Sequence, residues 1–457
     1  MKTTDVRVWA IRTKPGARPS YEVRWTVAGV PLSRTRKTKA LADNLRSKLL
    51  RAARDGEEFD TETGFPDSMA EKKSTLTWYT FALRYLAMKW PHAAPNTRDG
   101  INESLTSVTL ALLGDRPGRP EPRLLRQALR NWAFVLPGPD GRELPTNVAE
   151  ALHWVAKASR PLSDLADPVT GRMVLDSLKI KLDGIAAAAE TVQRKRRTLV
   201  NALHYAVDLS EFKENPLTGV RWQKPKIFNE VDPRVVANPE QARSLLHAVS
   251  YVGGYRRARG RRLVGLFAVM YFVGLRPAEA VGLAESDLAL PSSGWGEVLV
   301  HRTRPSVGKR WTDSGESHDD RGLKNRPAED VRRVPVPTQL VLLLAEHLDT
   351  FGTTPDGRLF FSEGGGVVSS SSYYRAWQEA RTLALPPAAV ASPLAHRPYD
   401  LRHSALSTWL NAGVDPTEVA ERAGNSVEVL LSRYAKCLDG RQEVANRRIE
   451  DLLREYE

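Results

Sequence analysis

Residues 398–404 have the sequence Pro-Tyr-Asp-Leu-Arg-His-Ser and open a predicted helix that continues to Leu410. An Asn-Ala-Gly turn ends this helix, and a second short helix is expected over 416–423 before a Gly-Asn-Ser turn. A third helix leads to Tyr434. Arg402 and a tyrosine therefore belong to one C-terminal helical unit, which is the first candidate for chemistry.

A second arginine lies at a helix junction upstream. The apolar run 267–273 is predicted to be helical and ends in Gly-Leu-Arg-Pro-Ala-Glu, in which Pro277 suits the first turn of a new helix. Arg276 is then held at the corner, with Glu279 one turn further along to orient it. An ordinary helix junction explains this motif equally well when it is taken alone.

Lysines are scarce in the same part of the chain. Only three occur after Asp232, although arginines are common. One of them, Lys324, belongs to a long polar excursion over 303–330 that is too charged to form core, between strands predicted over 295–301 and 332–336. If a reaction here needs a titratable ammonium group, Lys324 is one of three candidates, and an ordinary surface lysine is the alternative for each.

These residue types together suit chemistry at a phosphodiester. Two guanidinium groups can hold one phosphate and neutralise the charge that its transition state gains. A tyrosine hydroxyl can attack the phosphorus atom and form a covalent intermediate, and a lysine ammonium can protonate the oxygen that leaves. The sequence has no evident carboxylate cluster suited to Mg²⁺, so neither a metal nor another cofactor is expected.

Composition narrows the classes of protein to which the chain can belong. Its 457 residues are 26% charged and 41% hydrophobic, which fits about three globular domains of roughly 150 residues. A single cysteine, Cys437, excludes a disulfide scaffold and a Cys-rich zinc module. We find no apolar run of 18 residues and no signal-peptide pattern, so a cytoplasmic, nucleoid-associated protein without a membrane partner is expected.

The net charge of +13 is concentrated at the N-terminus. Residues 1–54 hold 14 Lys or Arg and three acidic residues, and such a density favours polyanions, because phosphate neutralisation releases counterions. The candidates for DNA binding in this segment are Arg34, Arg36, Lys37 and Lys39. The alternative is a solubilising surface or a flexible basic tail.

The basic segment has the pattern of a folded domain. Alternating apolar and polar residues predict three strands, over 6–11, 21–27 and 32–35. Thr38 can cap a helix that follows, in which apolar residues recur every fourth position: Leu41, Leu45 and Leu49. We expect a DNA-binding domain over 1–60, and the polar residues 56–73 are predicted to form a linker.

A helical domain is expected over 74–226. Helix spacing is clearest over 191–209, where Leu199 and Leu203 belong to an apolar stripe. The first turns of this helix carry four consecutive candidates for phosphate contact: Arg194, Lys195, Arg196 and Arg197. A solvated helix face without a partner is the alternative. After a second linker, a third domain over 234–457 carries the motifs described above.

The chain resembles the tyrosine recombinases (phage-type integrases), and it is similar to integrases of actinobacterial mobile elements. Four motifs in the same order carry the resemblance: Gly-Leu-Arg-x-x-Glu, a lysine before an Arg-Arg-Val-Pro strand, Tyr-Asp-Leu-Arg-His, and a tyrosine near the C-terminus. The resemblance implies that Arg276 and Arg402 hold the scissile phosphate. It also implies that Lys324 is the general acid and Tyr434 the nucleophile.

Two positions depart from the commoner pattern of the family. Tyr399 stands where histidine is usual, with His396 out of register to replace it, and Asn425 stands where histidine or tryptophan is usual. Both side chains can hydrogen-bond a phosphate, although a phenol is a poor base at neutral pH and an amide does not titrate. The alternative for Asn425 is a helix cap. Glu279 and His403 are expected to support the site rather than to react.

The resemblance also implies a fold class and a set of partners. The fold is expected to be multidomain and mainly α with small β-sheets: a three-stranded sheet plus helix, a helical core-binding domain and a mixed α/β catalytic domain. The implied activity is cutting and rejoining of double-stranded DNA attachment sites through a 3′-phosphotyrosine link, which integrates or excises a mobile element. A homotetramer on DNA is expected, with a directionality factor or a host DNA-bending protein as further candidate partners.

Alternatives stay open for the assembly and for the activity. An apolar stripe near the C-terminus can dock on a second protomer or on its own domain: Ala445, Ile449, Leu452 and Tyr456. A type IB topoisomerase shares the tyrosine and arginine chemistry but relaxes one duplex as a monomer. A catalytically weakened remnant of an integrase would bind DNA without forming a covalent adduct.

Overall fold

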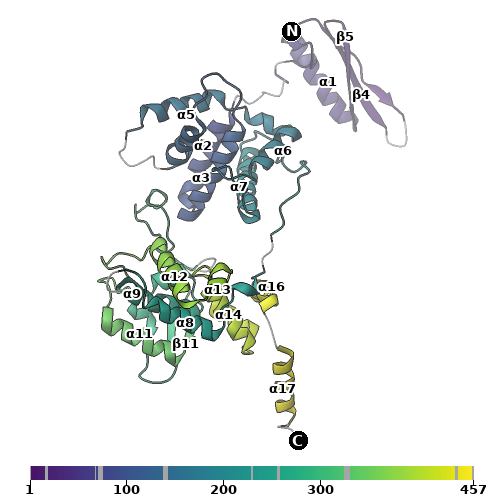
Figure 1. The fold of residues 1–457 in the computed structure, drawn as a ribbon. Coiled ribbons are helices and arrows are strands. Elements are labelled where there is room, and N and C mark those ends of the chain that lie inside the picture. Colours follow the sequence, from purple (N-terminus) through teal and green to yellow (C-terminus); the bar gives the residue numbers. More distant parts are fainter. Residues whose placement is uncertain are drawn as a thin grey trace.

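A computed structural model of the chain shows three bodies in succession: an N-terminal domain, a helical bundle from α2 to α7, and a larger body from α8 to α16 (Figure 1). The described residues are 2–15, 19–66, 68–69, 76–136, 143–227, 230–254, 258–323, 330–437 and 441–454. Helices predominate and the sheets are small and antiparallel, which confirms the expected fold class. The domain boundaries at 1–60, 74–226 and 234–457 stay a prediction.

The N-terminal domain is a small sheet covered on one face by a helix. Its elements are β1 (Lys2–Thr3), β2 (Val6–Val8), β3 (Arg12–Lys14), β4 (Ser20–Val27), β5 (Val30–Arg36), α1 (Lys39–Arg54) and β6 (Phe59–Asp60). On β4, Val23, Trp25 and Val27 are fully buried and alternate with polar residues, as the sequence predicted. The Thr38 side chain accepts a hydrogen bond from the Leu41 backbone amide and caps α1, which confirms the predicted helix start.

Three details of the predicted N-terminal domain are wrong. The first predicted strand, 6–11, is interrupted, because β2 and β3 both pair with β4 and the register shifts by one residue between them. Leu41 is 55% exposed, and Ala42 takes its place in the core. The predicted linker over 56–73 is partly core, since Phe59 is fully buried and Trp25 Nε1 donates to the Gly64 carbonyl at 2.6 Å.

The second body is a bundle whose core is rich in aromatic residues. Its elements are α2 (Trp78–Lys89), η1 (Trp90–His92), α3 (Pro95–Ala111), α4 (Pro122–Ala128), the π-helical turn η2 (Leu129–Ala133), α5 (Thr146–Ala158), η3 (Leu162–Ala166), α6 (Pro168–Ser177) and α7 (Ala189–Asp208). On α2, Trp78, Phe81 and Tyr85 follow helix spacing and are buried together. On α7, Leu199 and Leu203 form the buried stripe that the sequence predicted.

The third body surrounds a central helix with further helices and a short sheet. Its elements are η4 (Pro233–Val235), α8 (Pro239–Val249), α9 (Ala258–Phe272), α10 (Pro277–Gly282), η6 (Glu285–Asp287), β7 (Leu288–Ala289), β8 (Gly296–Val300), β9 (Arg302–Thr303), η7 (Lys309–Trp311), β10 (Arg321–Gly322), β11 (Arg332–Val336), α11 (Thr338–Phe351), α12 (Ser370–Ala384), α13 (Pro387–Ala391), α14 (Asp400–Asn411), α15 (Pro416–Ala423), α16 (Val427–Tyr434), η8 (Ala435–Cys437) and α17 (Arg441–Arg454). From Leu263 to Tyr271, α9 is buried almost all round, as is typical of a core helix. The sheet has the strand order β11-β8-β7.

The polar excursion between β8 and β11 is more ordered than its charge suggested. The strands β9 and β10 pair antiparallel, with Thr303 opposite Arg321, so that the segment between them forms a closed hairpin. Its tip carries Trp311, which is 4% exposed and belongs to the apolar core of the helical bundle. Leu323, in the same excursion, is buried in the core of the third body, so the expectation that the excursion lies outside the core is wrong for both residues. Among the described helices, none has both the length and the apolar character needed to cross a membrane.

Candidate active site

The fold brings together the motifs that are far apart in the sequence. Arg276 precedes the first turn of α10, while Arg402 and His403 lie on the first turn of α14. Asn425 lies in the turn between α15 and α16, and Tyr434 ends α16. The described candidates of this domain therefore lie at the ends of short helices or in the turns between them, where their side chains can meet around one phosphate.

A buried carboxylate orients the first arginine. Glu279 is 1% exposed, and its Oε1 accepts a hydrogen bond of 2.7 Å from Arg276 Nη1. The same carboxylate accepts hydrogen bonds from both Nη atoms of Arg332, at 3.2 and 2.8 Å. Burial alone would raise the pKa of Glu279, but the surrounding guanidinium groups, with Arg332 foremost, lower it to about 2. Glu279 therefore stays charged between Arg276 and Arg332, and its supporting role stays a prediction.

Arg332 is a site residue that the sequence reasoning missed. It begins β11 and is 3% exposed, although its position in the sequence marked it only as the start of a strand. Its side chain must be paired because an isolated buried cation is costly. The pairing of Arg332 with the motif residue Glu279 joins the sheet to α10. An arginine that opens a predicted core strand was the available signal.

The second arginine is held by backbone carbonyls. Arg402 is 1% exposed and donates to the carbonyls of Gly274 and of Ala423, the latter at 2.6 Å. Gly274 has a φ of +64°, and its carbonyl reaches the guanidinium from the corner that follows α9. Burial, reinforced by the charge of Arg276, lowers the pKa of Arg402. Three guanidinium groups and one carboxylate leave an excess of positive charge for a bound phosphate.

Gly424 lets the turn after α15 approach this cluster closely. It has a left-handed conformation, with φ +61° and ψ +48°, and ends α15. A Cβ atom at this position would overlap Arg332 Nη1. Its carbonyl oxygen accepts a hydrogen bond of 3.0 Å from Arg276 Nη2. The glycine is therefore required both by the backbone conformation and by the space next to Arg332.

The tyrosine hydroxyl lies against a histidine. Tyr434 Oη and His403 Nδ1 are 2.7 Å apart, and both side chains are buried. Burial, with the charge of Arg402 next in weight, lowers the pKa of His403 to about 4, so that the ring is neutral near pH 7. Burial also raises the pKa of Tyr434, although Arg402 opposes this shift. A neutral imidazole can accept the proton of the phenol, which gives His403 a more direct position than the sequence predicted.

The two unusual side chains also face this cluster. Asn425 Oδ1 accepts a hydrogen bond of 3.0 Å from Arg276 Nη2. The alternative role of Asn425 as a helix cap is wrong, because the Ser426 side chain caps α16 by accepting from the Val429 amide. The ring of Tyr399 meets His403 edge to face, with centroids 5.0 Å apart. Burial alone would lower the pKa of Arg276, because it disfavours the charged guanidinium group. Glu279 and then Tyr399 outweigh this effect, so that the pKa of Arg276 is raised above its ordinary value.

Lys324, the expected general acid, lies outside the described residues. Among the residues that the structure does describe, no group of three or more His, Cys, Asp or Glu side chains could hold a metal ion.

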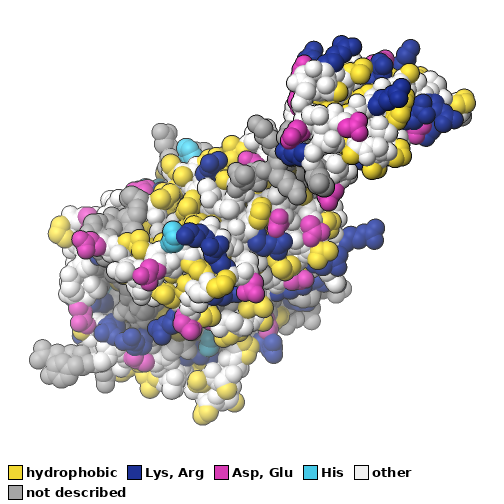
Figure 2. Space-filling view, turned by 90° about the horizontal axis from the view of Figure 1, so that it is seen from above, with side chains coloured by type: hydrophobic (Ala, Val, Ile, Leu, Met, Phe, Trp, Pro, Cys, Tyr) yellow, Lys and Arg dark blue, Asp and Glu magenta, His cyan; other side chains and the backbone are white. Residues whose placement is uncertain are grey.

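The cations of the N-terminal domain lie on two sides of its sheet. Arg34 and Arg36 are paired across the strands with Val23 and Tyr21, on the side that α1 covers. The open side carries a different set of cations, which the sequence reasoning did not select: Arg7, Arg12, Lys14 and Arg24. Lys37 and Lys39 are exposed at the start of α1. Figure 2 shows Lys and Arg side chains gathered on this protruding domain.

The four consecutive cations of α7 differ in their surroundings. Lys195 is fully buried, and its Nζ lies 3.2 Å from Glu103 Oε1 and 3.1 Å from Ser107 Oγ. The expectation that Lys195 contacts DNA is therefore wrong, because its ammonium group is already paired inside the bundle. Arg194 forms an ion pair with Glu103 and keeps 42% of its side chain exposed, Arg196 is partly buried, and Arg197 is exposed.

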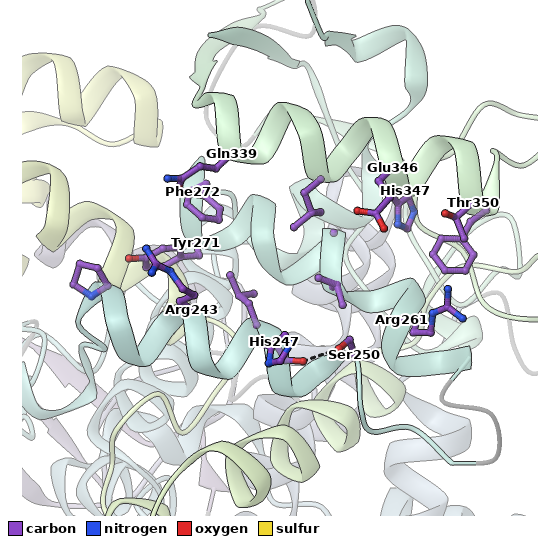
Figure 3. A pocket seen from close by; sticks show the side chains of 16 residues that line it. Arg243, His247, Ser250, Arg261, Tyr271, Phe272, Gln339, Glu346, His347 and Thr350 are labelled. Carbon is purple, nitrogen blue, oxygen red and sulfur yellow. Dashed lines mark hydrogen bonds between the residues drawn. The ribbon is translucent and has the colours of Figure 1, made fainter. Parts of the chain in front are cut away.

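Two of the hollows in the described part of the third body matter here, and one of them borders the site. A cavity of about 420 Å³ is lined by Tyr399 together with Arg397, Tyr374 and serines at the start of α12. A cavity of about 650 Å³ lies between α8, α9 and α11, and Figure 3 shows Phe272, His247 and Arg261 among the side chains around it. This second cavity contains none of the candidate catalytic residues.

The chain is similar to known recombinases. No family model matches it. A curated protein of Caldanaerobacter subterraneus subsp. tengcongensis, described as tyrosine recombinase XerC-like, is 22% identical over 286 residues, which cover 58% of this chain and 67% of that protein. The Tn1549 transposon integrase, solved with transposon right end DNA, is 18% identical, with a TM-score of 0.46 over 69% of this chain and 96% of that chain. The XerH site-specific recombinase bound to palindromic difH substrate is 14% identical, with a TM-score of 0.47; the match covers 82% of this chain and 98% of that chain.

Replacing Gly424 by alanine tests the close approach at the site. Gly424→Ala should lower the free energy of unfolding by about 2–4 kcal/mol, because it adds left-handed strain and an overlap with Arg332. Gly365→Ala is the matched control, since Gly365 has a φ of +75° with no atom within 4 Å of the added Cβ. It should cost only the strain, about 1–2 kcal/mol. Equal losses in denaturant unfolding would contradict the assigned contact.

The depressed pKa of His403 predicts a pH-dependent stability. Between pH 6.5 and about 4 the unfolded histidine binds a proton that the folded one does not, so the free energy of unfolding falls as the pH drops through this window. His403→Gln removes this contribution, and its stability should fall less over the same window, by on the order of 2 kcal/mol. Denaturant unfolding at several pH values measures the difference. Parallel curves for the two proteins would show that His403 titrates normally.

Proposed function

Since the chain is similar to a tyrosine recombinase and carries the motifs of that family, we propose that it is a site-specific DNA recombinase that cuts and rejoins double-stranded attachment sites. The mobile element that carries those sites would be integrated or excised by the reaction. One observation carries the proposal: the Tyr434 hydroxyl lies 2.7 Å from His403 Nδ1, and Arg402 interacts electrostatically with both Tyr434 and Arg276. We further propose that the enzyme acts on nucleoid DNA in the cytoplasm.

The positive groups of the site suit a single phosphodiester. Arg276 keeps 33% of its side chain exposed after its hydrogen bonds to Glu279, Gly424 and Asn425, so part of the guanidinium is open to a ligand. Because Asn425 uses its oxygen to accept from Arg276, its amide nitrogen is left to donate to a phosphate oxygen. Fixed donors of this kind stabilise the charge of a phosphorane transition state without reorganising.

The proposed chemical step starts from the contact between Tyr434 Oη and His403 Nδ1. Tyr434 Oη attacks the phosphorus atom, and His403 Nδ1 accepts its proton. The bond between phosphorus and the 5′ oxygen breaks, and that oxygen takes a proton from Lys324, the proposed general acid. The product is a 3′-phosphotyrosine and a free 5′-hydroxyl group. Attack by the 5′-hydroxyl of another strand reverses each transfer and rejoins the DNA, so no cofactor or external energy source is consumed.

A raised pKa of the tyrosine makes the histidine useful. Burial disfavours the phenolate of Tyr434, so the free anion is scarce near neutral pH. A neutral acceptor in contact with the hydroxyl removes the proton as the bond to phosphorus forms. His403 is held neutral by burial and by Arg402, which is the state that this role needs. We therefore assign His403 a catalytic role, as proton acceptor, rather than a structural one.

The cavity beside Tyr399 gives the DNA strand a path from the site. It is lined by Arg397, whose side chain is 63% exposed, and by serines at the N-terminus of α12. A helix N-terminus and an open guanidinium both favour phosphate groups. We propose that the phosphates next to the scissile one lie there.

We propose that α17 joins protomers in a cyclic homotetramer on DNA. It carries the exposed apolar side chains of Ile449, Leu452 and Leu453, and Figure 1 shows it standing apart from α16. The cavity between α8, α9 and α11 has apolar walls with Arg243 and Arg261 among its lining residues (Figure 3), which suits a helix that also carries acidic residues. Of the expected C-terminal stripe, Ala445 and Tyr456 have side chains outside the described set. A directionality factor and a host DNA-bending protein stay predictions.

The first test of the function is a covalent adduct. Incubating the full chain with a nicked duplex that carries its core attachment site should give a denaturation-resistant protein–DNA adduct that maps to Tyr434. Tyr434→Phe should bind the duplex normally and form no adduct, because the nucleophilic oxygen is gone. His403→Gln should bind normally and form the adduct about 10²-fold or more slowly, since a general base contributes that much.

The outcomes separate the alternatives. Normal binding by the wild-type chain without any adduct would identify a non-catalytic remnant. An adduct accompanied by relaxation of supercoiled DNA, with no joining of two sites, would favour a type IB topoisomerase. An adduct that persists in Tyr434→Phe would show that another residue is the nucleophile.

A second test concerns the open face of the N-terminal sheet, which we propose binds a distal DNA site. Removing two of its cations, in Arg12→Ala/Arg24→Ala, should reduce the slope of log affinity against log salt by about two, because each lost phosphate contact removes about one unit. Arg34→Ala/Arg36→Ala removes the same charge from the side that α1 covers, and it should change the slope less. A larger effect of the second pair would return the DNA contact to Arg34 and Arg36.

A further inference from the structure

A hairpin of the catalytic domain reaches into the helical domain, and neither catalysis nor DNA binding as described above accounts for it. The hairpin is residues 302–322, from β9 to β10. Beyond those strands, Ser306 and His318 form a β-bridge, and the Val307 amide donates to the Ser317 carbonyl at 2.9 Å. These bonds stiffen the hairpin as far as η7 at its tip. A charged segment of this length would otherwise be expected to lie in solvent.

The tip of the hairpin is anchored by a tryptophan. Trp311 is 4% exposed, and its ring lies 6.0 Å from the ring of Trp90 at the end of α2. The Arg130 guanidinium, also from the helical bundle, lies 5.8 Å from the centre of the Trp311 ring. An aromatic residue enclosed in this way by another domain has the character of an interface anchor.

An arginine of the helical domain fastens the same tip. Arg98 on α3 is 3% exposed, and its two Nη atoms donate to the two carboxylate oxygens of Asp313 at 2.7 and 2.9 Å. Arg98 also donates to the backbone carbonyls of Trp311 and Trp90, at 2.8 and 3.2 Å. A two-pronged ion pair with additional carbonyl contacts fixes orientation as well as distance.

The root of the hairpin adjoins the active site. The Arg304 amide donates to the Ala278 carbonyl on α10 at 2.8 Å, so the hairpin is attached to the helix that Arg276 precedes. Arg276 itself does not need this support, since Glu279, Gly424 and Asn425 hold it. The other strand, β10, continues through the buried Leu323, and Lys324 is the next residue of the sequence. In the sequence, the hairpin therefore comes just before Lys324, the proposed general acid.

We propose that the docked hairpin is a positioning device for protonation of the leaving oxygen, and that Trp311, Arg98 and Asp313 are its positioning residues. The helical domain, which the family resemblance implies is the core-binding domain, then holds the hairpin that comes just before the proposed general acid in the sequence. Protonation of the leaving oxygen thereby depends on the position of the helical domain. The inference rests on the proposed function, because it needs a leaving oxygen and a DNA substrate.

The test is a leaving group that needs no proton. In a duplex with sulfur in place of the 5′-bridging oxygen of the scissile phosphate, a thiolate leaves unprotonated, because a thiol has a pKa of about 8.5. Trp311→Ala in the full chain should slow single-turnover cleavage of the oxygen duplex about 10- to 100-fold, the scale expected for a misplaced catalytic group. On the sulfur duplex the same variant should lie within about threefold of the wild-type rate, because no general acid is needed.

Controls separate positioning from folding. Trp295→Ala removes a tryptophan that is 63% exposed in the same domain, and it should leave both rates unchanged. Trp311→Phe keeps an aromatic anchor and should restore most of the oxygen rate. Asp313→Asn should reproduce part of the defect, whereas Glu316→Gln removes an exposed charge from the same hairpin and should not. Thermal unfolding and duplex affinity are measured for each variant.

The results decide between distinct failures. A loss in Trp311→Ala that is equal on both duplexes would overturn the inference, since the hairpin would then act on folding or on phosphate binding. Unchanged cleavage of the oxygen duplex by Trp311→Ala would overturn it as well. If the wild-type chain forms no adduct with either duplex, the proposed function itself fails and the inference fails with it.

Discussion

The buried carboxylate of Glu279 is the interaction on which the active site depends. It takes hydrogen bonds from Arg276 and Arg332, and so ties the start of α10 to the edge strand β11. Removing it would leave two guanidinium groups close together with no counter-charge, an arrangement that a low-dielectric interior strongly disfavours. The low pKa of Glu279 shows that its charge persists across the physiological range. The positions of Gly424 and Asn425 follow, because both pack against the guanidinium groups that Glu279 orients.

The arginines give the site a surplus of positive charge, while burial favours the neutral forms of Tyr434 and His403. Three arginines around one carboxylate leave the cluster short of an anion, which a phosphodiester supplies. Burial keeps Tyr434, the proposed nucleophile, protonated and its neighbour His403 neutral. In the proposed reaction, a proton moves between them only when the bond to phosphorus forms. The reactive state is therefore tied to the arrival of the substrate. The same low-dielectric surroundings that strengthen the arginine–phosphate attraction also restrain the free tyrosine.

Local sequence patterns predicted which helices and strands form better than they predicted where folded segments begin and end. Alternation over 21–27 marked β4 correctly, since one face of that strand is buried. Helix spacing marked α7, and the two strands either side of the excursion pair as β8 and β11. The supposed linker after α1 was misjudged because Gly64 and Phe65 contact Trp25 across the domain, and no local pattern records a contact of that range. A sequence pattern indicates which residues of an element are buried, but it does not show which other element they pack against.

The sequence by itself supplied the candidate catalytic residues and their order, because two arginines, a lysine and a tyrosine in four ordered motifs resemble the tyrosine recombinase pattern. It also placed Arg276, Arg402 and Tyr434 at the ends of helices, where caps and glycine turns are visible locally. Only the tertiary structure decided which groups meet: the approach of His403 to Tyr434, the pairing of Arg332 with Glu279, and the burial of Lys195. These contacts join elements distant in sequence, so each depends on how the helices pack. Burial also sets the pKa values, and burial is a property of the folded chain alone.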